Sequence, residues 1–361
     1  MDIKTWLVFV SIAVALSIGG YALSTHWASP STLNGKIQAY PDSHNTGKAY
    51  DAMSKQNAAS KTLRQLVSPI PTQPNIDKEK AKIGWLLFKD PNLSSSGGVS
   101  CESCHDLRSN GAETTEVSVG VNGQGSRNSL TVFNVGFNYR FFWDGRANSL
   151  ADQLDGPVHN VLEMDTNWSE ITRYVRSSKR YPNMFGHVDL DINERNIKAV
   201  LVEFMLGLTT PSSPFDQYLL GNQSALNERQ KRGWESFQHE GCINCHRGVN
   251  IGGGMVMRFG YFGENKIGEN RTNDTGKHSS TQNTKDMYLF RVASLRNVAE
   301  TAPYFHDGKT HSLREAIQIM AESQLGKTFD QQTTDDIYAF LTTLSGKRPS
   351  ILEEFSNDSN R

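Results

Sequence analysis

Two short motifs decide the fold of this 361-residue chain: CESCH at residues 101–105 and CINCH at residues 242–246. They contain all four cysteines of the sequence, and each pair runs directly into a histidine. In a helix, cysteines spaced this way lie one turn apart on the same face, so their sulfurs can form thioether bonds to both vinyl groups of one haem. The imidazole of the next residue then lies beneath the iron. The sequence therefore predicts two covalently bound c-type haems, with these residues: Cys101, Cys104 and His105 for the first, and Cys242, Cys245 and His246 for the second.

Three other uses of paired cysteines fit the sequence less well. Two pairs can hold one tetrahedral zinc ion, but such a site does not need a histidine after each pair. The chain has 10 His among 361 residues, so chance would place one after both pairs with a frequency of only about 0.001. A disulfide within each pair would be local and would add little stability. A thioredoxin-type motif requires a βαβ context, which the sequence lacks.

The body of the chain contains two copies of one plan. The segment GWLLF at 84–88 precedes the first motif, and GWESF at 233–237 precedes the second. Downstream, the first copy continues with NV at 134–135, WDGR at 143–146 and SL at 149–150, and the second repeats these with identical spacing as NV at 297–298, HDGK at 306–309 and SL at 312–313. We therefore expect two domains that arose by an internal duplication.

Most of the ordered sequence has helical periodicity. Apolar residues share one helix face at Ile197, Val200, Leu201, Phe204 and Leu208, at Leu313, Ala316, Ile317 and Met320, and at Ile337, Phe340, Leu341 and Leu344. Strand-like alternation is scarce, and the best candidate is residues 255–262. We predict a mainly α protein with long irregular loops.

The predicted organisation has five segments. They are a signal anchor or signal peptide at residues 1–24, a flexible tether at 25–62, an N-terminal domain with the first haem at 63–215, a C-terminal domain with the second haem at 216–350, and a tail at 351–361. The boundary between the domains follows from a proline-containing stretch, from about residue 211 to residue 226, that interrupts a helical pattern.

The amino terminus predicts export. Lys4 precedes an uncharged, mostly apolar run from Trp6 to Leu23, which is near the minimum of about 17–25 residues that a membrane span requires. The small residues around Leu23 also suit a cleavage site, so the run is either a retained membrane anchor or a removed signal peptide. In both cases the body of the chain is exported. Because haem is attached covalently outside the cytoplasm in bacteria, we expect a periplasmic location.

The charge balance argues against nucleic acid as a partner. Lys plus Arg is 37 and Asp plus Glu is 38, which gives a formal net charge of −1. Binding to phosphates requires a clustered basic excess. The hydrophobic content of 37% is enough to fill a core.

The two copies differ at the position expected to face the iron. Aligning Trp143 with His306 places Met320 opposite Pro157. The thioether of Met320 can be the sixth ligand of the second iron, although a methionine on an apolar helix face is also an ordinary core residue. Proline offers no ligand, so the first iron is open unless Met164 closes it. A His/Met pair raises the reduction potential and an open iron binds small oxidants, so the asymmetry predicts an enzyme with one electron-storing haem and one reactive haem.

From about Leu63 to Gly346 the sequence resembles the bacterial diheme cytochrome c peroxidases. The motifs that carry the resemblance are RNS at 127–129, TVFN at 131–134, FWDGR at 142–146, GPVHN at 156–160, EM at 163–164, LRN at 295–297, TAPYFH at 301–306, and Met320 ahead of QLG at 324–326. The resemblance implies two domains that are each like a class I cytochrome c. It also implies a peroxidatic haem on His105 and a high-potential haem, where electrons enter, on His246 and Met320.

The same resemblance implies roles for further residues. Trp143 matches the tryptophan that lies between the haems, although a large aromatic side chain there can also serve packing alone. Glu163 and Gln153 match the polar groups of the peroxide pocket; without the surrounding motif, Glu163 would be read as a solvent-facing acid. The resemblance also implies an interdomain calcium ion, whose expected ligands are the side chain of Asn128 and the carbonyl oxygens of Thr301 and Pro303.

One loop departs from the family pattern. Typical members have a histidine just before the RNS motif, and this histidine caps the peroxidatic iron in the oxidised resting enzyme. Here the loop at residues 120–126 reads GVNGQGS, with Val121 where the histidine belongs. We therefore expect the first haem to be open even when fully oxidised, with no reductive activation. His159 is the alternative ligand, but it matches a different loop of the family.

The expected function is reduction of hydrogen peroxide to water. A carboxylate such as Glu163 can take the proton from one peroxide oxygen and return it to the other, while Gln153 orients the substrate. Electrons arrive singly from a small soluble donor, a cytochrome c or a cupredoxin, and pass Trp143. Two other functions stay open: a diheme oxidase of a protein or small-molecule substrate, and a non-catalytic electron carrier. The sequence does not specify the donor or whether the chain forms a homodimer.

Overall fold

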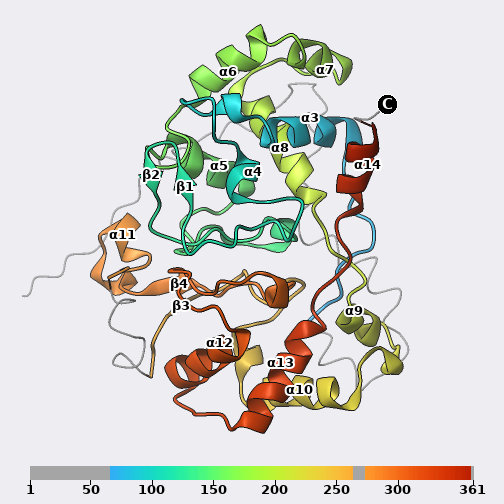
Figure 1. Cartoon of the computed structure of the whole chain (residues 1–361), viewed down its shortest axis with the longest axis vertical. Helices are drawn as coiled ribbons and strands as arrows, with labels where there is room; N and C mark the ends of the chain where they lie inside the picture. Colours follow the sequence, from blue (N-terminus) through green and yellow to red (C-terminus); the bar gives the residue numbers. More distant parts are fainter. Residues whose placement is uncertain (1–65, 263–272, 359–361) are drawn as a thin grey trace, which may run out of the picture. The chain divides into compact units, whose positions relative to one another are not determined.

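A computed structural model describes residues 66–262 and 273–358 of the chain, and this part is mainly helical (Figure 1). The helices of the first half are α3 (Lys78–Phe88), α4 (Cys101–Cys104), α5 (Leu150–His159), α6 (Trp168–Ser177), α7 (Tyr181–His187) and α8 (Glu194–Leu206). The helices of the second half are α9 (Pro214–Leu219), α10 (Glu228–His239), α11 (His278–Thr281), α12 (Leu313–Met320), α13 (Gln331–Thr342) and α14 (Ser350–Asp358). The three periodic segments of the sequence thus form α8, α12 and α13. The prediction of a mainly α protein is confirmed.

Strands are short and lie in the loops. β1 (Val119–Gly120) pairs with β2 (Gly123–Gln124) as an antiparallel hairpin, and β3 (Val256–Arg258) pairs antiparallel with β4 (Leu289–Arg291). β3 lies within the segment 255–262 that the sequence analysis selects as the best strand candidate. The hairpin of β1 and β2 was not expected, because its two-residue strands leave no detectable alternation in the sequence.

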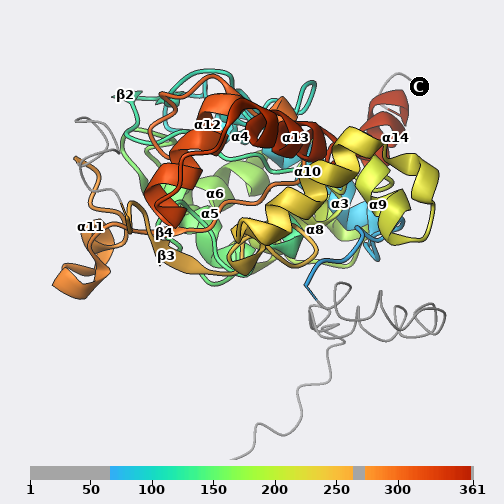
Figure 2. The ribbon, with the colours of Figure 1, turned by 90° about the horizontal axis from the view of Figure 1, so that it is seen from below.

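A glycine allows one close helix crossing in each half. A Cβ atom on Gly84 of α3 would lie 1.9 Å from the carbonyl oxygen of Val200 in α8, and a Cβ atom on Gly233 of α10 would lie 1.8 Å from that of Asp336 in α13. No side chain fits at either contact, so glycine lets each pair of helix backbones touch. The crossing of α3 and α8 can be followed in Figure 1, and the packing of α10 along α13 in Figure 2.

Backbone geometry repeats in the loops that follow the two motifs. Asn134 and Asn297 adopt left-handed conformations with φ of 60° and 62°, and Phe142 and Phe305 do so with φ of 63° and 69°. Positive φ is uncommon for asparagine and rarer for a bulky aromatic residue. Each pair occupies matching positions in the two sequence copies, so the copies share local structure as well as sequence.

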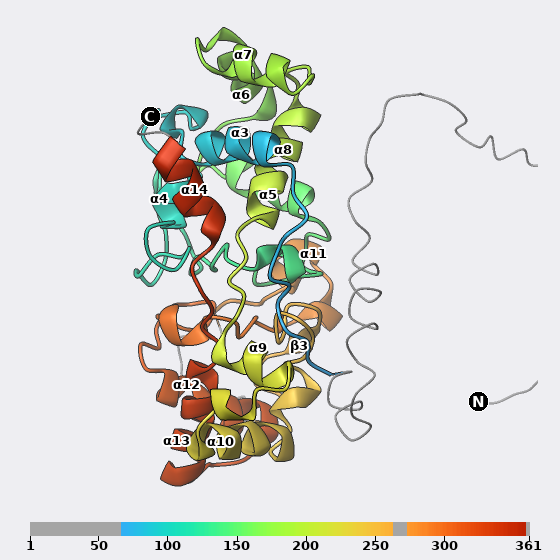
Figure 3. The ribbon, with the colours of Figure 1, turned by 90° about the vertical axis from the view of Figure 1, so that its right-hand side faces the viewer.

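The described residues form two hydrophobic cores. The first is built from residues between Ala81 and Leu208, and the second from residues between Phe215 and Leu344. Two segments pack into the core of the other half of the chain. Val67 belongs to the second core, although it was assigned to the N-terminal domain. Residues 351–358, which the sequence analysis treats as a tail, belong to α14, whose buried apolar face lies against α3 in the first core (Figure 3).

The chain between the two halves joins their matching loops. The side-chain nitrogens of Asn134 and Asn297 both donate to the hydroxyl of Thr210, at 2.7 and 3.0 Å. All three residues are buried. Because these buried side chains supply hydrogen-bond partners for one another, the network fixes the two loops against each other.

No helix within residues 66–262 and 273–358 has the length and apolar character that a membrane crossing requires. The predicted anchor or signal at 1–24 and nearly all of the tether at 25–62 lie outside the described residues.

Candidate active site

Each cysteine motif forms a single tight turn. The backbone N–H of His105 donates to the carbonyl of Cys101 at 3.0 Å, and that of His246 donates to Cys242 at 3.0 Å. The first turn is α4 and the second begins as a 3₁₀ helix at Cys242–Asn244. All four thiols are free. The turn therefore brings two thiols and one imidazole to one place in each half, as a c-type haem requires.

The two motifs line different cavities. Cys101, Cys104 and His105 line a cavity of about 900 Å³, here called the first cavity. Cys242, Cys245 and His246 line another of about 420 Å³, the second cavity. Four cysteines divided between two cavities cannot surround one zinc ion. Nor do the described residues contain any group of three or more His, Cys, Asp or Glu side chains arranged to hold a metal ion.

The protonation states of these side chains suit haem. Burial lowers the pKa of both histidines, that of His246 to about 4, so both imidazoles are neutral and can bind iron. The Nδ1 of His246 contacts the carbonyl oxygen of Ala293 at 3.1 Å, which leaves Nε2 for the metal. The Nδ1 of His105 is buried without a hydrogen bond. Burial also raises the pKa of the thiols of Cys101 and Cys242 to about 12, so both are neutral thiols at neutral pH.

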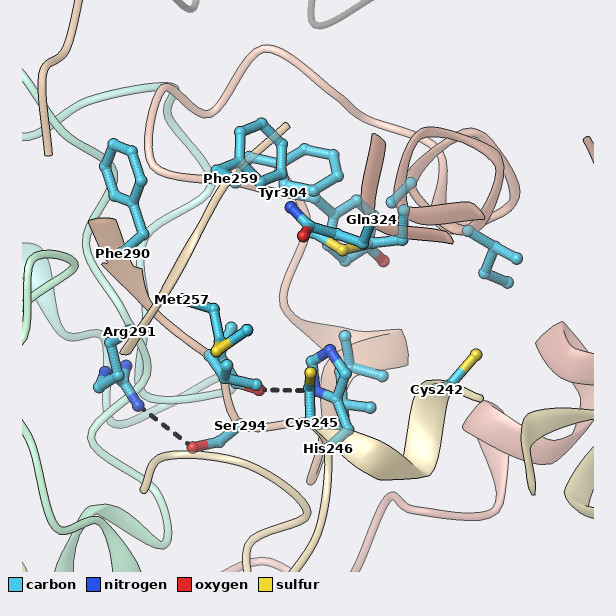
Figure 4. A pocket seen from close by; sticks show the side chains of 18 of the residues that line it. Cys242, Cys245, His246, Met257, Phe259, Phe290, Arg291, Ser294, Tyr304 and Gln324 are labelled. Atoms are coloured by element: carbon cyan, nitrogen blue, oxygen red, sulfur yellow. Dashed lines mark hydrogen bonds between the residues drawn. The ribbon is translucent and has the colours of Figure 1, made fainter. Parts of the chain in front are cut away.

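The linings of the two cavities differ at the position that the sequence alignment selects. Met320 lines the second cavity and Pro157, its counterpart, lines the first. Met320 is the last residue of α12 and is followed by a π-helical turn at Ala321–Leu325, a feature common at functional sites. Figure 4 shows the second cavity with Cys242, Cys245 and His246 on one side and Gln324 and Tyr304 across from them. Met164 is buried in the first core and also lines the first cavity, so it stays a competing ligand there.

A carboxylate and an amide line the first cavity together. Gln153 lies on α5, and Glu163 follows the turn after that helix. The side-chain nitrogen of Asn160 donates to Oε1 of Glu163 at 2.6 Å. Burial raises the pKa of Glu163 above its usual 4.5, and outweighs the hydrogen bond from Asn160 and the charge of Arg146, which favour the ionised form. A carboxyl group with a raised pKa in a cavity suits proton transfer.

Trp143 lines both cavities. Its indole Nε1 donates to the carbonyl of Asn128 at 2.8 Å, and its ring meets that of His306 edge to face at 6.3 Å. His306 is buried and stacks on Phe290 at 4.2 Å. The matching residues of the two sequence copies, Trp143 and His306, therefore pack against each other between the haem cavities.

The three expected calcium ligands lie around the second cavity, and Asn128 lines the first as well. The side-chain nitrogen of Asn128 donates to the carbonyl of Thr115 at 3.1 Å. Pro303 follows a cis peptide bond. The structure thus brings Asn128, Thr301 and Pro303 to one region, and the calcium ion itself stays a prediction.

The loop that lacks the histidine is the hairpin of β1 and β2. The backbone N–H of Val121 donates to the carbonyl of Glu163 at 2.8 Å, and the side chain of Asn122 donates to the carbonyl of Val161 at 2.8 Å. A Cβ atom on Gly120 would lie 2.2 Å from the carbonyl oxygen of Leu162. The hairpin therefore packs closely against the segment that carries Glu163. His159, the alternative ligand, is exposed and does not line the cavity.

Comparison with known proteins agrees with this geometry. The sequence profile of the family described as di-haem cytochrome c peroxidase matches residues 78–224. Cytochrome c551 peroxidase of Pseudomonas aeruginosa is 39% identical over 311 residues, which cover 83% of this chain and 88% of that protein. The chain belongs to the di-haem cytochrome c peroxidase family.

Two further relatives extend the match. Cytochrome c peroxidase Ccp of Escherichia coli is 37% identical over 296 residues, which cover 81% of this chain and 64% of that protein. The crystal structure of a MauG-like protein associated with microbial copper homeostasis matches with a TM-score of 0.69 at 26% identity, over 81% of this chain and 97% of that one. The fold of this di-haem peroxidase family member is therefore shared with both peroxidases and MauG-like proteins.

Sequence reasoning missed a network of charged groups that lines the first cavity of this family member. Arg127 donates to Asp144 at 2.8 Å and to Asp274 at 2.6 and 2.8 Å. Burial alone would raise the pKa of Asp144, but hydrogen bonds and charge from Arg127 and Arg146 hold that pKa below its usual value. Arg127 and Asp144 lie in the quoted family motifs, but Asp274 lies far away in sequence, so only the folded chain reveals this network.

Proposed function

We propose that this protein reduces hydrogen peroxide to water with electrons from a small c-type cytochrome or a similar donor. The relatives that carry the name of cytochrome c peroxidase support this proposal. One observation carries it. Two cavities, each lined by a CxxCH motif, differ in their other lining residues: the second has Met320, and the first has Pro157 with Glu163 and Gln153.

The residues present fit two c-type haems. His105 would hold the first iron, and His246 with Met320 the second, with thioether bonds from the paired cysteines. When bound, such haems supply an iron that takes up peroxide and a second iron that stores one electron. The remaining chemistry belongs to the side chains.

Glu163 moves the proton that peroxide cleavage requires. Its ionised carboxylate accepts the proton from one peroxide oxygen, and the resulting acid donates it to the other oxygen, which leaves as water. Asn160 holds the carboxylate by the 2.6 Å hydrogen bond. Gln153, an uncharged donor and acceptor on the same cavity, orients the peroxide.

In the proposed route, electrons would enter at the second haem and pass Trp143. The position of its ring beside both cavities supports this route. A calcium ion bound by Asn128, Thr301 and Pro303 would stabilise the junction at which Trp143 donates to the carbonyl of Asn128. The donor is a small soluble cytochrome c or cupredoxin, and the protein works in the periplasm, either soluble or tethered by the amino-terminal segment.

The two halves are cytochrome c-like domains, at about residues 63–215 and 216–350, that arose by duplication. Two structural observations support this. The glycine-mediated helix crossing occurs once in each half, and the left-handed asparagines and phenylalanines fall at matching positions.

With haem in place, His105 alone would hold the first iron in the fully oxidised protein. No histidine lies in the hairpin of β1 and β2, and its hydrogen bonds to the Glu163 segment support a fixed conformation. Electron paramagnetic resonance of the oxidised protein tests this: one high-spin and one low-spin haem are expected. Two low-spin, six-coordinate haems would contradict the proposal.

A MauG-like oxidase is the second candidate function. The absence of the loop histidine and the structural match to a MauG-like protein favour it. Steady turnover of peroxide with a reduced small cytochrome separates the two functions, because an oxidase of a protein substrate would turn over little peroxide with that donor. A pure electron carrier would bind added cyanide slowly or not at all, since both irons would be closed.

A further inference from the structure

Arg291 is a buried cation that the proposed reaction has not used. It is the last residue of β4 and only 5% exposed. Its Nε donates to the carbonyl of Phe142 at 3.2 Å, and its Nη1 donates to the hydroxyl of Ser294 at 3.4 Å. A guanidinium has five N–H donors, and both acceptors here are neutral. Among residues 66–262 and 273–358, no carboxylate pairs with this side chain.

Two neighbouring arginines, the buried Arg296 and the half-buried Arg127, are neutralised by carboxylates. Arg296 lies 2.7 Å from the carboxylate of Asp216, and Arg127 is held by two aspartates. Burial lowers the pKa of Arg291 to about 10, with no nearby charge to oppose it, and the group is still protonated at neutral pH. Burial of an unpaired charge is strongly unfavourable. A guanidinium kept in such a place points to an anionic partner that the described part of the chain does not provide.

The position of Arg291 identifies where that anion lies. The residue lines both cavities, and its backbone N–H donates to the carbonyl of Trp143 at 2.7 Å. It lies two positions before Ala293, whose carbonyl oxygen contacts Nδ1 of His246 at 3.1 Å. In Figure 4, Arg291 lies at the edge of the second cavity with its guanidinium directed toward Ser294.

We propose that Arg291 binds a carboxylate of the prosthetic group in the second cavity, a propionate of the haem on His246. The proposal rests on the haem sites of the proposed function. A planar guanidinium with free donors matches the two oxygens of a carboxylate. A fixed positive charge beside this haem disfavours the oxidised, more positive iron, so Arg291 raises its reduction potential relative to the first haem.

Spectroelectrochemical titration of the full-length, haem-loaded protein tests this assignment. In R291Q, the ratio of oxidised to reduced iron in the His246 haem, at a fixed applied potential, is expected to rise about tenfold, which corresponds to a fall of 59 mV for a one-electron couple. The matched control is R247Q, which removes the same charge beside the same motif at an exposed position. It is expected to change the ratio less than about threefold, because solvent screens its charge.

Two results would overturn the assignment: an unchanged potential in R291Q with both haems bound, or an equal shift in R247Q. If R291Q does not accumulate with both haems, R291K and resonance Raman spectroscopy decide instead. Lysine keeps the positive charge but lacks the planar pair of N–H donors of a guanidinium. The propionate bending band of the His246 haem is therefore expected to shift in R291K, and an unshifted band refutes the contact. Neither readout depends on peroxide turnover, so a protein that shows the shift but does not turn over peroxide would support this inference and contradict the proposed function.

Discussion

Replacement of Glu163 with glutamine removes the proposed proton carrier and almost nothing else. Glutamine has the same length, and its side-chain oxygen can still accept the 2.6 Å hydrogen bond from Asn160. The backbone carbonyl of residue 163, which accepts from Val121, is unaffected. The variant therefore keeps the geometry of the cavity and loses the ability to ionise.

The size of the effect follows from what else can ionise in the first cavity. A positioned acid–base group contributes about 10²–10⁴-fold to a rate. Four other carboxylates line the cavity: Asp144 and Asp274, which Arg127 holds, and Glu116 and Asp307. We expect a loss within this range, about 10²–10⁴-fold in kcat/KM for peroxide, or roughly 3–5 kcal/mol of activation free energy.

The assay is steady-state oxidation of a reduced small cytochrome c by peroxide, measured against pH. Burial raises the pKa of Glu163 above 4.5, and the ionised form is the base. The wild-type rate should therefore fall as the pH decreases through a value above 4.5, and E163Q should lack this limb. E116Q is the matched control, because Glu116 lines the same cavity but is exposed, and its rate should match that of the wild type. Turnover by E163Q within about threefold of the wild type, with both haems spectrally normal, would refute the reasoning.

Other perturbations test other parts of the argument. M320L should remove the His/Met spectral signature of the second haem, and a spectrum identical to the wild type would show that another group is the ligand. G84A should lower the free energy of unfolding by about 1–3 kcal/mol, because its Cβ atom would lie 1.9 Å from the carbonyl oxygen of Val200; G186A, which meets open space in α7, should change it by less than about 1 kcal/mol. D144N should cost about 3 kcal/mol at neutral pH. Because the folded pKa of Asp144 is lowered, its contribution is present above pH 3.8 and is lost as the pH falls through the folded pKa, so the difference from the wild type should shrink in acid denaturation. Removal of calcium with a chelator should lower peroxide turnover, and added calcium should restore it. A turnover rate that neither treatment changes would contradict the calcium site.

Much of this protein can be predicted from local sequence. The two CxxCH motifs each complete one turn, so spacing alone brings the thiols and the imidazole together. Helical periodicity gives α8, α12 and α13, because burial of one face leaves a repeating apolar pattern. The internal repeat also gives the register in which Met320 and Pro157 occupy matching cavities.

Other properties arise only when distant segments pack together. The sequence gives no reason for the raised pKa of Glu163, because burial by its neighbours produces it. α14 follows the second half of the chain but packs in the first core, and its local sequence pattern does not indicate which core it joins. From the sequence alone Arg291 is an ordinary charged residue, but in the fold it lines two cavities and pairs with no carboxylate of the described residues. Covalent spacing and periodicity are properties of neighbours along the chain and can therefore be read from the sequence, whereas burial and charge compensation depend on which segments meet in space.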